Sequence, residues 1–500
     1  MKKITYIGVL CTLVFACTSP DDSLPPADGG NKTDPQWFDG LDLPQADPTG
    51  YPYDRTKMTT ATVSINTSSK VAANNLLLGL NFSGFTTADE KEIVRYLDPV
   101  TVRFPTGVWS NWYDWETDSY SYPNDGYDIG EFHRRVIDTW QILGVVGGFP
   151  GLKELHDELG FNMLFTYNVN TDSPAESVAR LKDREAKGFD VKYIELGNEQ
   201  FWEDQRSAKT ATPINYLMTA SAIAKALKAE KPSVKLSVPY GWRANQAAYN
   251  AQVGLKIGPF EIDFDAISLH KYVDPEKSSP NVVKTKDTYK TILNSGREID
   301  IAKDFVSQFK PDKTIWLTEW GVNAGKSAAS YLGQADAYLY LFANQDVYER
   351  AEWFGATTVL NAMYKYEGDP VPGSPLVNLK KTGFGMVYEI LRDVFEDSEL
   401  LETTVFTRIL DESMNAVEAR AVTKNGKTQL FVLNKTPRSV PFRAEIDGKF
   451  WEGSQKLESL SFNSLQDDKL LDANENPLTL ISEGTDVVVL PPFSVSKITL

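Results

Sequence analysis

Hydrophobic and polar positions follow two different periods along this 500-residue chain. From about residue 75, short apolar runs rich in β-branched and aromatic residues are separated by longer segments in which apolar positions recur every three or four residues. Strands that alternate with amphipathic helices are typical of a parallel α/β fold. Eight runs have the strand pattern: 76–84, 99–105, 161–168, 191–199, 234–241, 264–272, 314–321 and 353–363.

The segments between these runs carry helix signals. Thr87 and Glu90 have the spacing of a capping box at the start of a helix. A further helix ends before Pro232 and has one apolar face, made by Tyr216, Ala220, Ile223 and Leu227. Helices are also predicted at 334–351 and 385–395. Eight strands with intervening helices predict a (β/α)₈ TIM barrel. A doubly wound sheet usually has fewer strands and a phosphate-binding loop, which we do not find here.

After about residue 400 the pattern changes to short alternating strands separated by turn residues, at 416–423, 428–434, 440–446 and 485–500. Such a series predicts a C-terminal β-sandwich. The run 60–66, which precedes the barrel, has the pattern of a strand that joins this sandwich. The predicted domains are therefore an N-terminal strand segment at 57–74, a catalytic barrel at 75–398 and a β-sandwich at 399–500.

The first residues have the pattern of an export signal. A basic start at Lys2 and Lys3 precedes an apolar stretch that is too short to span a bilayer. Cys17 follows the small residue Ala16, and this resembles the lipobox of bacterial lipoproteins, in which the cysteine becomes the lipidated N-terminus. We therefore expect a lipoprotein signal peptide at 1–16, with ordinary secretion as the alternative. Because Cys11 leaves with the signal, no disulfide is expected.

Residues 17–56 are rich in Pro, Asp, Gly, Ser and Thr, which predicts a flexible linker between a membrane anchor and the folded body. The expected location is the outer membrane, facing the cell surface or the periplasm, and the chain is expected to be a monomer. Its formal net charge of −17 argues against nucleic acid as a partner. With 3 His and no clustered Cys, a His-rich metal site is not expected either.

Polar residues gather where the predicted strands end. In a (β/α)₈ barrel the catalytic groups lie at the carboxyl ends of the strands, so all of these side chains are expected at one rim. Two of them are carboxylates, Glu199 after strand four and Glu319 at the end of strand seven. The others are Arg103, Asn168, Asn198, His270, Tyr272 and Trp320.

A pair of carboxyl groups is what glycoside hydrolysis requires. One protonates the leaving oxygen, and the other attacks the anomeric carbon or activates water. In the retaining reaction the two groups lie close together, and the pKa of the acid must be raised so that it stays protonated near neutral pH. Strands four and seven can direct Glu199 and Glu319 to a single sugar across the barrel.

At this point the chain resembles glycoside hydrolase clan A, the retaining (β/α)₈ enzymes. The matching stretches are "ELGNE" (195–199) and "WLTEWG" (316–321). The resemblance implies that Glu199 is the acid/base and Glu319 the nucleophile, and that Asn198 hydrogen-bonds the sugar 2-hydroxyl. No cofactor and no metal are implied.

Two further stretches are similar to this clan. "VRFPTG" (102–107) looks like a stretch of α-L-arabinofuranosidases whose arginine supports the nucleophile, although Thr106 stands where a glycine is expected. "SLHKY" (268–272) is similar to the strand-six His and Tyr that line the site, which implies the same for His270 and Tyr272. The barrel-plus-sandwich layout is similar to that of families 30, 39, 51, 79 and 86.

Several of these residues also have a structural interpretation. Glu199 can be the dipole partner of a helix N-terminus, and Arg103 can neutralise a buried Glu195. His270 can be a core histidine, and Asn168 an ordinary strand-end amide. Trp109 lies in the long loop 109–149 and Trp320 follows the nucleophile, so both are candidates to stack on sugar rings.

The sequence therefore predicts a retaining glycosidase that acts on a plant or algal polysaccharide or oligosaccharide. One alternative is a non-catalytic carbohydrate-binding surface lipoprotein, which usually lacks one of the two carboxylates. Another is a metal-dependent barrel hydrolase, which needs several His and Asp ligands at strand ends. Lys271 and Arg243 also lie near strand ends, where they can contact an acidic or sulfated sugar or remain solvated.

Overall fold

The computed structural model describes a large part of the chain, and these are the residues discussed below. The described residues are 41–56, 58–81, 87–274, 286–355, 361–368, 377–411 and 414–500. The predicted signal peptide and Cys17 lie outside them, as does the first part of the predicted linker. Among the described residues, no helix combines the length and the apolar composition needed to cross a membrane.

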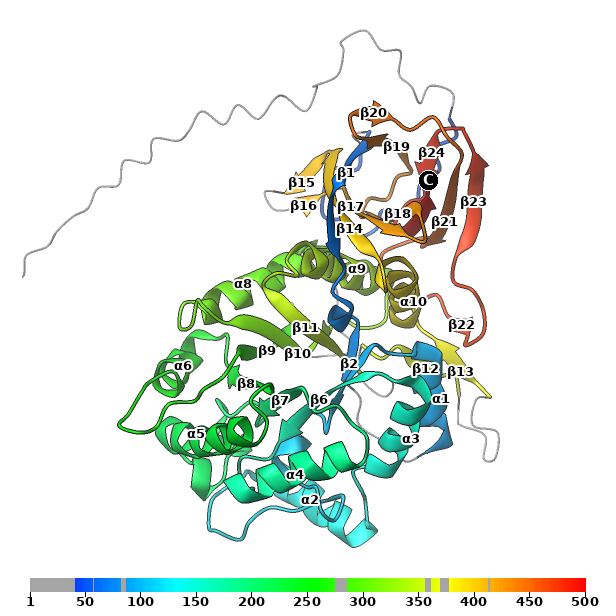
Figure 1. Cartoon of the computed structure of the whole chain (residues 1–500). Coiled ribbons are helices and arrows are strands. Elements are labelled where there is room, and N and C mark those ends of the chain that lie inside the picture. The colour runs from blue at the N-terminus through cyan, green and yellow to red at the C-terminus, as the bar shows by residue number, and fades with distance from the viewer. Residues whose placement is uncertain are drawn as a thin grey trace, which may run out of the picture. The chain divides into compact units, whose positions relative to one another are not determined.

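Eight parallel strands form a closed barrel, which confirms the predicted (β/α)₈ fold (Figure 1). The barrel closes where β11 pairs with β2, with Trp353 opposite Leu80. In barrel order the strands are β2 (Gly79–Asn81), β3 (Thr101–Phe104), β6 (Asn162–Tyr167), β7 (Tyr193–Leu196), β8 (Lys235–Tyr240), β9 (Ala266–Val273), β10 (Thr314–Val322) and β11 (Tyr348–Phe354).

Helices follow the barrel strands along the chain, and their apolar faces share one hydrophobic core with the strands. The predicted capping box is present, because the Glu90 amide donates to Thr87 Oγ1 and the Thr87 amide donates to Glu90 Oε2. The ten helices assigned within the described residues are α1 (Ala88–Leu97), α2 (Glu131–Leu143), α3 (Phe149–Leu159), α4 (Pro174–Ala186), α5 (Pro213–Glu230), α6 (Ala247–Val253), α7 (Lys286–Leu293), α8 (Ser295–Ser307), α9 (Ala328–Ala343) and α10 (Gly383–Phe395).

The eighth strand differs from its predicted position at 353–363. It is β11, Tyr348–Phe354, and it begins within the stretch predicted as a helix at 334–351; the helix α9 ends at Ala343. The charged residues Arg350 and Glu352 made this stretch look unlike a buried strand. In the structure both are fully buried, and Arg350 Nε donates to Glu352 Oε1 at 2.6 Å. Because these two charges neutralise each other inside the barrel, the pattern of hydrophobic residues alone does not predict this strand.

The segment after β3, predicted as a long loop at 109–149, is largely folded. It contains a short 3₁₀ helix at Val108–Trp112, the strands β4 (Tyr113–Asp114) and β5 (Ser119–Tyr120), and α2. Trp112, Ile129 and Ile137 form a small separate core within it. The insertion therefore has apolar packing of its own.

The C-terminal region is a ten-stranded sheet that curls around its own core. Its strands, in sheet order, are β20 (Lys449–Phe450), β19 (Val440–Ile446), β1 (Ala61–Ala72), β14 (Glu399–Thr407), β17 (Val417–Lys424), β18 (Lys427–Asn434), β25 (Ser494–Thr499), β21 (Gln455–Ser461) and β23 (Thr479–Gly484), and β24 (Val488–Leu490) pairs with β19. The strand β1, far ahead in sequence, lies between β14 and β19. This separate β-rich region completes the predicted fold class.

Short strands accompany the two main sheets. One three-stranded sheet links the end of the barrel segment to the C-terminal region, and one hairpin extends from β14. The strands are β12 (Tyr364–Tyr366), β13 (Leu379–Lys381) and β22 (Leu471–Asp472), and then β15 (Ile409–Asp411) and β16 (Met414–Asn415).

Residues 42–56 are not the flexible tether that their composition predicted. Tyr51 is buried, and its ring makes an edge contact with Phe493 at 5.9 Å. Gln45 and Asp47 form bridges to residues 438 and 464 of the C-terminal region. Aromatic burial outweighs the local content of Pro, Asp and Gly, so this part of the linker packs onto the body.

The barrel helices and the C-terminal sheet share side-chain contacts. Phe342 of α9 stacks on Phe395 of α10 at 4.1 Å, and Phe395 in turn contacts Phe431 of β18. A buried ion pair between Asp336 of α9 and Lys435 lies at the same junction. Apolar and ionic contacts therefore fix the last two barrel helices against the sheet.

Candidate active site

The turn after β7 places two of the predicted site residues. Gly197 has φ +85°, and a Cβ there would come within 2.8 Å of Val169 Cγ2, so the turn requires glycine. Glu199 has φ +42°, a left-handed conformation that is uncommon for residues other than glycine. Such strain is often found at functional sites, where it fixes the direction of a side chain.

Asn198 is held through both its backbone and its side chain. Its amide donates to Asn111 Oδ1 at 3.0 Å, and its carbonyl accepts from Asn111 Nδ2 at 2.9 Å. Its side-chain Nδ2 donates to Gln205 Oε1 at 2.8 Å. Gln205 also donates to Glu199 Oε2 at 2.8 Å. Asn111 and Gln205 therefore fix the turn that carries Asn198 and Glu199.

Arg103, at the end of β3, connects three of these groups. Its guanidinium donates to Glu195 Oε2 at 2.6 Å, to Glu319 Oε2 at 3.2 Å and to Asn198 Oδ1 at 2.7 Å. Arg103 therefore neutralises Glu195 and contacts Glu319 at the same time, so the two interpretations of this residue are compatible. Planar geometry suits arginine to such multiple contacts.

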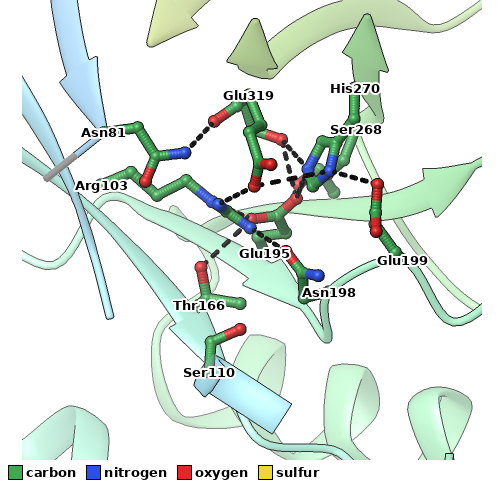
Figure 2. A network of polar contacts seen from close by, with 12 residues as sticks. Asn81, Arg103, Ser110, Thr166, Glu195, Asn198, Glu199, Ser268, His270 and Glu319 are labelled. Carbon is green, nitrogen blue, oxygen red and sulfur yellow. Dashed lines mark hydrogen bonds and ion pairs between the residues drawn. The ribbon is translucent and has the colours of Figure 1, made fainter. Parts of the chain in front are cut away.

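His270, on β9, contacts both carboxylates of the predicted pair. Its Nδ1 lies 3.1 Å from Glu199 Oε1 and 3.7 Å from Glu319 Oε2. Its Nε2 lies 3.1 Å from Thr318 Oγ1 and 3.6 Å from Glu195 Oε1. In Figure 2, Glu195 and Glu319 lie between Arg103 and His270, and Glu199 lies beyond the imidazole ring.

Three carboxylates therefore share two cationic side chains, but only two of the three reach the surface of the site. The Glu195 side chain is fully buried, whereas those of Glu199 and Glu319 are 23% and 10% exposed. Thr166 and Thr318 each donate a hydroxyl to Glu195, at 3.1 and 2.8 Å. Glu195 is thus an internal counter-ion, and Glu199 and Glu319 are available to a bound molecule.

The shared charges shift the pKa values of Glu195 and His270 far from their ordinary values. Burial alone would raise the pKa of Glu195, but the Arg103 charge and hydrogen bonds from His270 and Thr318 lower it to about 2. Burial alone would lower the pKa of His270, but the negative charge of Glu319 and hydrogen bonds to Glu195 and Glu199 raise it to about 10. The imidazole is therefore a cation near neutral pH.

The pKa of Glu199 differs from the sequence-based expectation, which required an acid with a raised value. Burial acts to raise it, but the hydrogen bond and positive charge of His270, together with Gln205 and Arg103, lower it. The expectation was based on the Glu199 carboxyl group alone. In the structure the adjacent imidazolium of His270 stabilises the ionised form of that group. In the free protein, the dissociable proton of this pair lies on His270.

Tyr272, two residues after His270 on β9, contacts the second carboxylate. Its hydroxyl donates to Glu319 Oε1 at 2.7 Å. Glu319 thus has one oxygen facing Tyr272 and the other facing Arg103 and His270. Alternate residues of a strand point to the same face, so His270 and Tyr272 both face the barrel interior.

Two predicted sugar contacts have other roles. Trp320 follows the inward-facing Glu319, so its side chain points to the opposite face of β10. It is fully buried and makes ring contacts with Tyr338 of α9 at 4.9 Å and with Trp353 at 4.8 Å. Asn168 is 1% exposed, and its side chain bonds the amides of the following turn and the carbonyl of Tyr113. Neither side chain is available to a sugar.

Trp109 belongs to the aromatic cluster of the insertion after β3. Its ring lies 4.5 Å from Trp140, 6.2 Å from Phe132 and 5.9 Å from His133. The ring is half-buried in these contacts. Trp109 therefore contributes to the packing of the insertion. Only the exposed part of its ring is left for a contact with a sugar.

Sequence reasoning missed several residues of the network. Asn111, Gln205 and Thr166 lie outside the stretches that carry the resemblance, and Thr318 lies within one of them without an expected role. Asn111, Thr166 and Thr318 contact side chains that only the closed barrel brings close, whereas Gln205 contacts Asn198 and Glu199 within its own loop. Only Thr318 had a sequence signal, because it immediately precedes Glu319 in "WLTEWG".

The arrangement offers acid, base and nucleophile functions. A proton at His270 Nδ1 can pass to Glu199, and the side-chain oxygens of Glu319 lie where they can reach an electrophilic carbon of a bound molecule. Over the described residues, no group of three or more His, Cys, Asp or Glu side chains is placed to hold a metal ion.

We expect Arg103→Leu to destabilise the fold severely. The substitution leaves Glu195 buried and without its cationic partner, and breaking a buried ion pair in this way costs about 3–5 kcal/mol. Urea denaturation of the variant and of the wild type measures the change. Arg95→Leu is the matched control, because Arg95 makes ion pairs with Glu92 and Glu158 at the protein surface, where such pairs contribute little. Equal losses for the two variants would contradict this account of the network.

Scans against protein-family models and against curated protein sequences find no match. Solved structures do match. The chain is similar to the arabinofuranosidase of glycoside hydrolase family 51 from Xanthomonas axonopodis pv. citri, with a TM-score of 0.64 and 16% identity over 88% of this chain and 100% of that one. It is similar to the α-L-arabinofuranosidase of Thermotoga maritima, with a TM-score of 0.65 and 15% identity over the same shares.

A family 44 xyloglucanase from Paenibacillus polymyxa is also similar, with a TM-score of 0.60 and 13% identity over 88% of this chain and 99% of that one. At these identities the comparison establishes the fold alone. The resemblance inferred from "ELGNE" and "WLTEWG" is therefore confirmed as a likeness of architecture: the chain has the barrel and the β-rich region of clan A glycoside hydrolases.

Proposed function

We propose that this protein is a retaining glycoside hydrolase, with Glu319 as nucleophile and Glu199 as acid/base. The supporting observation is that one atom, His270 Nδ1, lies 3.1 Å from Glu199 Oε1 and 3.7 Å from Glu319 Oε2. These two oxygens cannot be farther apart than the two distances together. That limit accommodates the separation of about 5–5.5 Å found in retaining enzymes and falls near the lower end of the about 6.5–9.5 Å found in inverting ones.

In the first step, Glu319 attacks the anomeric carbon and the bond to the leaving oxygen breaks. Glu199 donates a proton to that oxygen, and a glycosyl-enzyme ester forms on Glu319. In the second step, Glu199 takes a proton from water, the water oxygen attacks the anomeric carbon, and Glu319 is released. Arg103 and Tyr272 orient Glu319, and Arg103 and Gln205 hold the buried side chain of Asn198.

The proton that Glu199 delivers comes from His270 in this proposal. The free site holds an imidazolium beside Glu199, whose pKa is lowered. As Glu319 forms its ester bond it loses its negative charge, and that charge is the strongest influence that raises the pKa of His270. The proton can then move from His270 Nδ1 through Glu199 to the leaving oxygen. Hydrolysis of the ester returns a proton through Glu199 to His270, so the cycle closes.

This arrangement predicts an alkaline limb of the pH profile that is set by His270. Activity requires the shared proton, and a group with a raised pKa holds its proton until the pH rises through about 10. We expect kcat/KM of the wild type to persist into the alkaline range. His270→Asn should move this limb to lower pH by about two pH units or more. Initial rates across pH measure the effect, and an alkaline limb that does not move in His270→Asn would refute the proton-sharing proposal.

The substrate class is proposed from the neighbours as well as from the site. The similar structures are an arabinofuranosidase, an α-L-arabinofuranosidase and a xyloglucanase, all enzymes of glycan hydrolysis. We propose a plant or algal polysaccharide, or an oligosaccharide derived from one. A fold of this kind supports many glycosidase specificities, so the sugar must be found by assay.

The test is product analysis on a panel of plant and marine-algal polysaccharides. Wild type, Glu199→Gln and Glu319→Gln are compared, with Glu203→Gln as the control because this exposed glutamate lies on the same loop. We expect the wild type and the control to release oligosaccharides and both site variants to be inactive. A wild type that binds a glycan but cleaves none would instead identify a carbohydrate-binding protein.

We also propose export and lipidation at Cys17, with the protein held at the outer membrane as a monomer. The support is the basic and apolar start of the chain and the position of Cys17 after Ala16. In a Gram-negative host, the full chain should be recovered in the membrane fraction and take up labelled fatty acid. Cys17→Ser should lose both properties; a wild type without label would contradict the proposal.

A further inference from the structure

A cationic and aromatic cluster lies on the rim beside Glu199, and the proposed reaction does not use it. Trp242 and Arg243 come directly after β8, the barrel neighbour of β7. Trp202 lies on the loop that follows Glu199, and its amide donates to the Glu199 carbonyl at 2.8 Å. Three residues of chain span at most about 11 Å, so Trp202 is close to any oligosaccharide held at Glu199. We call Trp202, Trp242 and Arg243 the Arg243 platform.

The guanidinium of Arg243 lies close to two indole rings. Its Cζ lies 5.6 Å from the centre of the Trp202 ring and 5.4 Å from that of Trp242. Lys271 lies against the Trp242 ring as well, at 4.0 Å. Contacts between cations and indoles of this kind restrict the arginine side chain before any ligand arrives.

The charges of the two cations are balanced differently. Lys271 is buried and is neutralised by Glu298 at 3.1 Å. Arg243 is exposed and forms no ion pair with any acidic side chain in the described ranges. The chain as a whole has a net charge of −17. An exposed arginine without such a partner creates a local positive potential next to the candidate active site, and this potential attracts anions.

The shape and chemistry of this cluster match one kind of sugar. Half-exposed indole rings can pack against the apolar face of a sugar ring. The planar guanidinium can donate two parallel hydrogen bonds to a carboxylate or to a sulfate. We propose that the Arg243 platform is a subsite for a sugar that carries an anionic group, either a uronate carboxylate or a sulfate ester. This inference rests on the proposed function, since the subsite would bind a neighbour of the sugar that is cleaved.

Binding measurements test the subsite without requiring hydrolysis. Two matched pairs of probes are used, polygalacturonate oligosaccharides against their methyl esters, and carrageenan oligosaccharides against their desulfated forms. Isothermal titration calorimetry with the Glu319→Gln protein gives the dissociation constants while preventing cleavage. We expect the anionic member of at least one pair to bind about 10- to 100-fold more tightly than its neutral partner. The pair that shows the difference identifies the anionic group.

Adding Arg243→Gln should abolish this preference, and adding Arg443→Gln should leave it intact. Arg443 is the matched control because it also lies over an aromatic ring, Phe450 at 4.2 Å, but in the C-terminal sheet. The subsite is refuted if neither pair shows a preference, or if the preference survives in Arg243→Gln. Hydrolysis of neutral glycans without any anionic preference would refute the subsite alone. An anionic preference in a protein that hydrolyses no glycan would refute the proposed function alone.

Discussion

Glu319→Ala is expected to lower kcat by at least about 10⁴-fold on any glycan that the wild type hydrolyses, because the loss of a covalent nucleophile has effects of this size. The side chain is held by Arg103 at 3.2 Å and by Tyr272 at 2.7 Å, and its removal opens a space beside the anomeric carbon. Steady-state rates on a cleaved oligosaccharide measure the loss. Glu203→Ala, which changes an exposed carboxylate on the loop after Glu199, should keep wild-type activity.

Azide distinguishes loss of the nucleophile from general damage. In Glu319→Ala, azide can enter the space of the missing carboxylate and attack the anomeric carbon of an activated aryl glycoside directly. A single displacement inverts the configuration, so the expected product is the glycosyl azide of opposite anomeric configuration. Formation of the azide with retained configuration would show that another residue acts as the nucleophile.

Glu199→Ala is expected to have the second largest effect, and the effect should depend on the leaving group. General acid catalysis contributes about 10²–10⁴-fold, so kcat/KM on a polysaccharide should fall by that factor. An aryl glycoside with a strongly acidic phenol needs no proton, so its kcat/KM should fall far less. Rates on a series of aryl glycosides of increasing phenol pKa measure this dependence.

Azide gives a second test of Glu199. In Glu199→Ala, the glycosyl-enzyme on Glu319 still forms from an activated substrate, and azide can attack it without base assistance. The expected product is a glycosyl azide of retained configuration, opposite to that from Glu319→Ala. Equal losses on all aryl glycosides, with no rescue by azide, would contradict the acid/base role.

Much of the fold follows from local patterns. The capping box at Thr87 and the apolar face of α5 depend on residues close in sequence, and both were predicted. The strand β11 was misplaced because its buried charges, Arg350 and Glu352, neutralise one another only once the barrel has closed. The burial of Tyr51 likewise depends on Phe493, far along the chain.

Part of the candidate site likewise follows from the sequence, and part depends on contacts between residues far apart in it. Glu199 and Glu319 were selected because parallel strands bring their carboxyl ends to one rim. The low pKa of Glu199 was not foreseen, since it arises from His270, Gln205 and Arg103, which reach it through space. The outward position of Trp320 did follow from the two-residue period of a strand, once Glu319 was taken to point inward. The sequence alone therefore indicates that Trp320 faces away from the site.

Double displacement by the Glu199 and Glu319 pair underlies the proposed function. Proton NMR of the first product released by the wild type tests it most directly, before the new reducing end equilibrates between its anomers. We expect the product to have the anomeric configuration of the bond that was cleaved. A first product of inverted configuration would contradict it, because a single displacement by water needs no glycosyl-enzyme on Glu319.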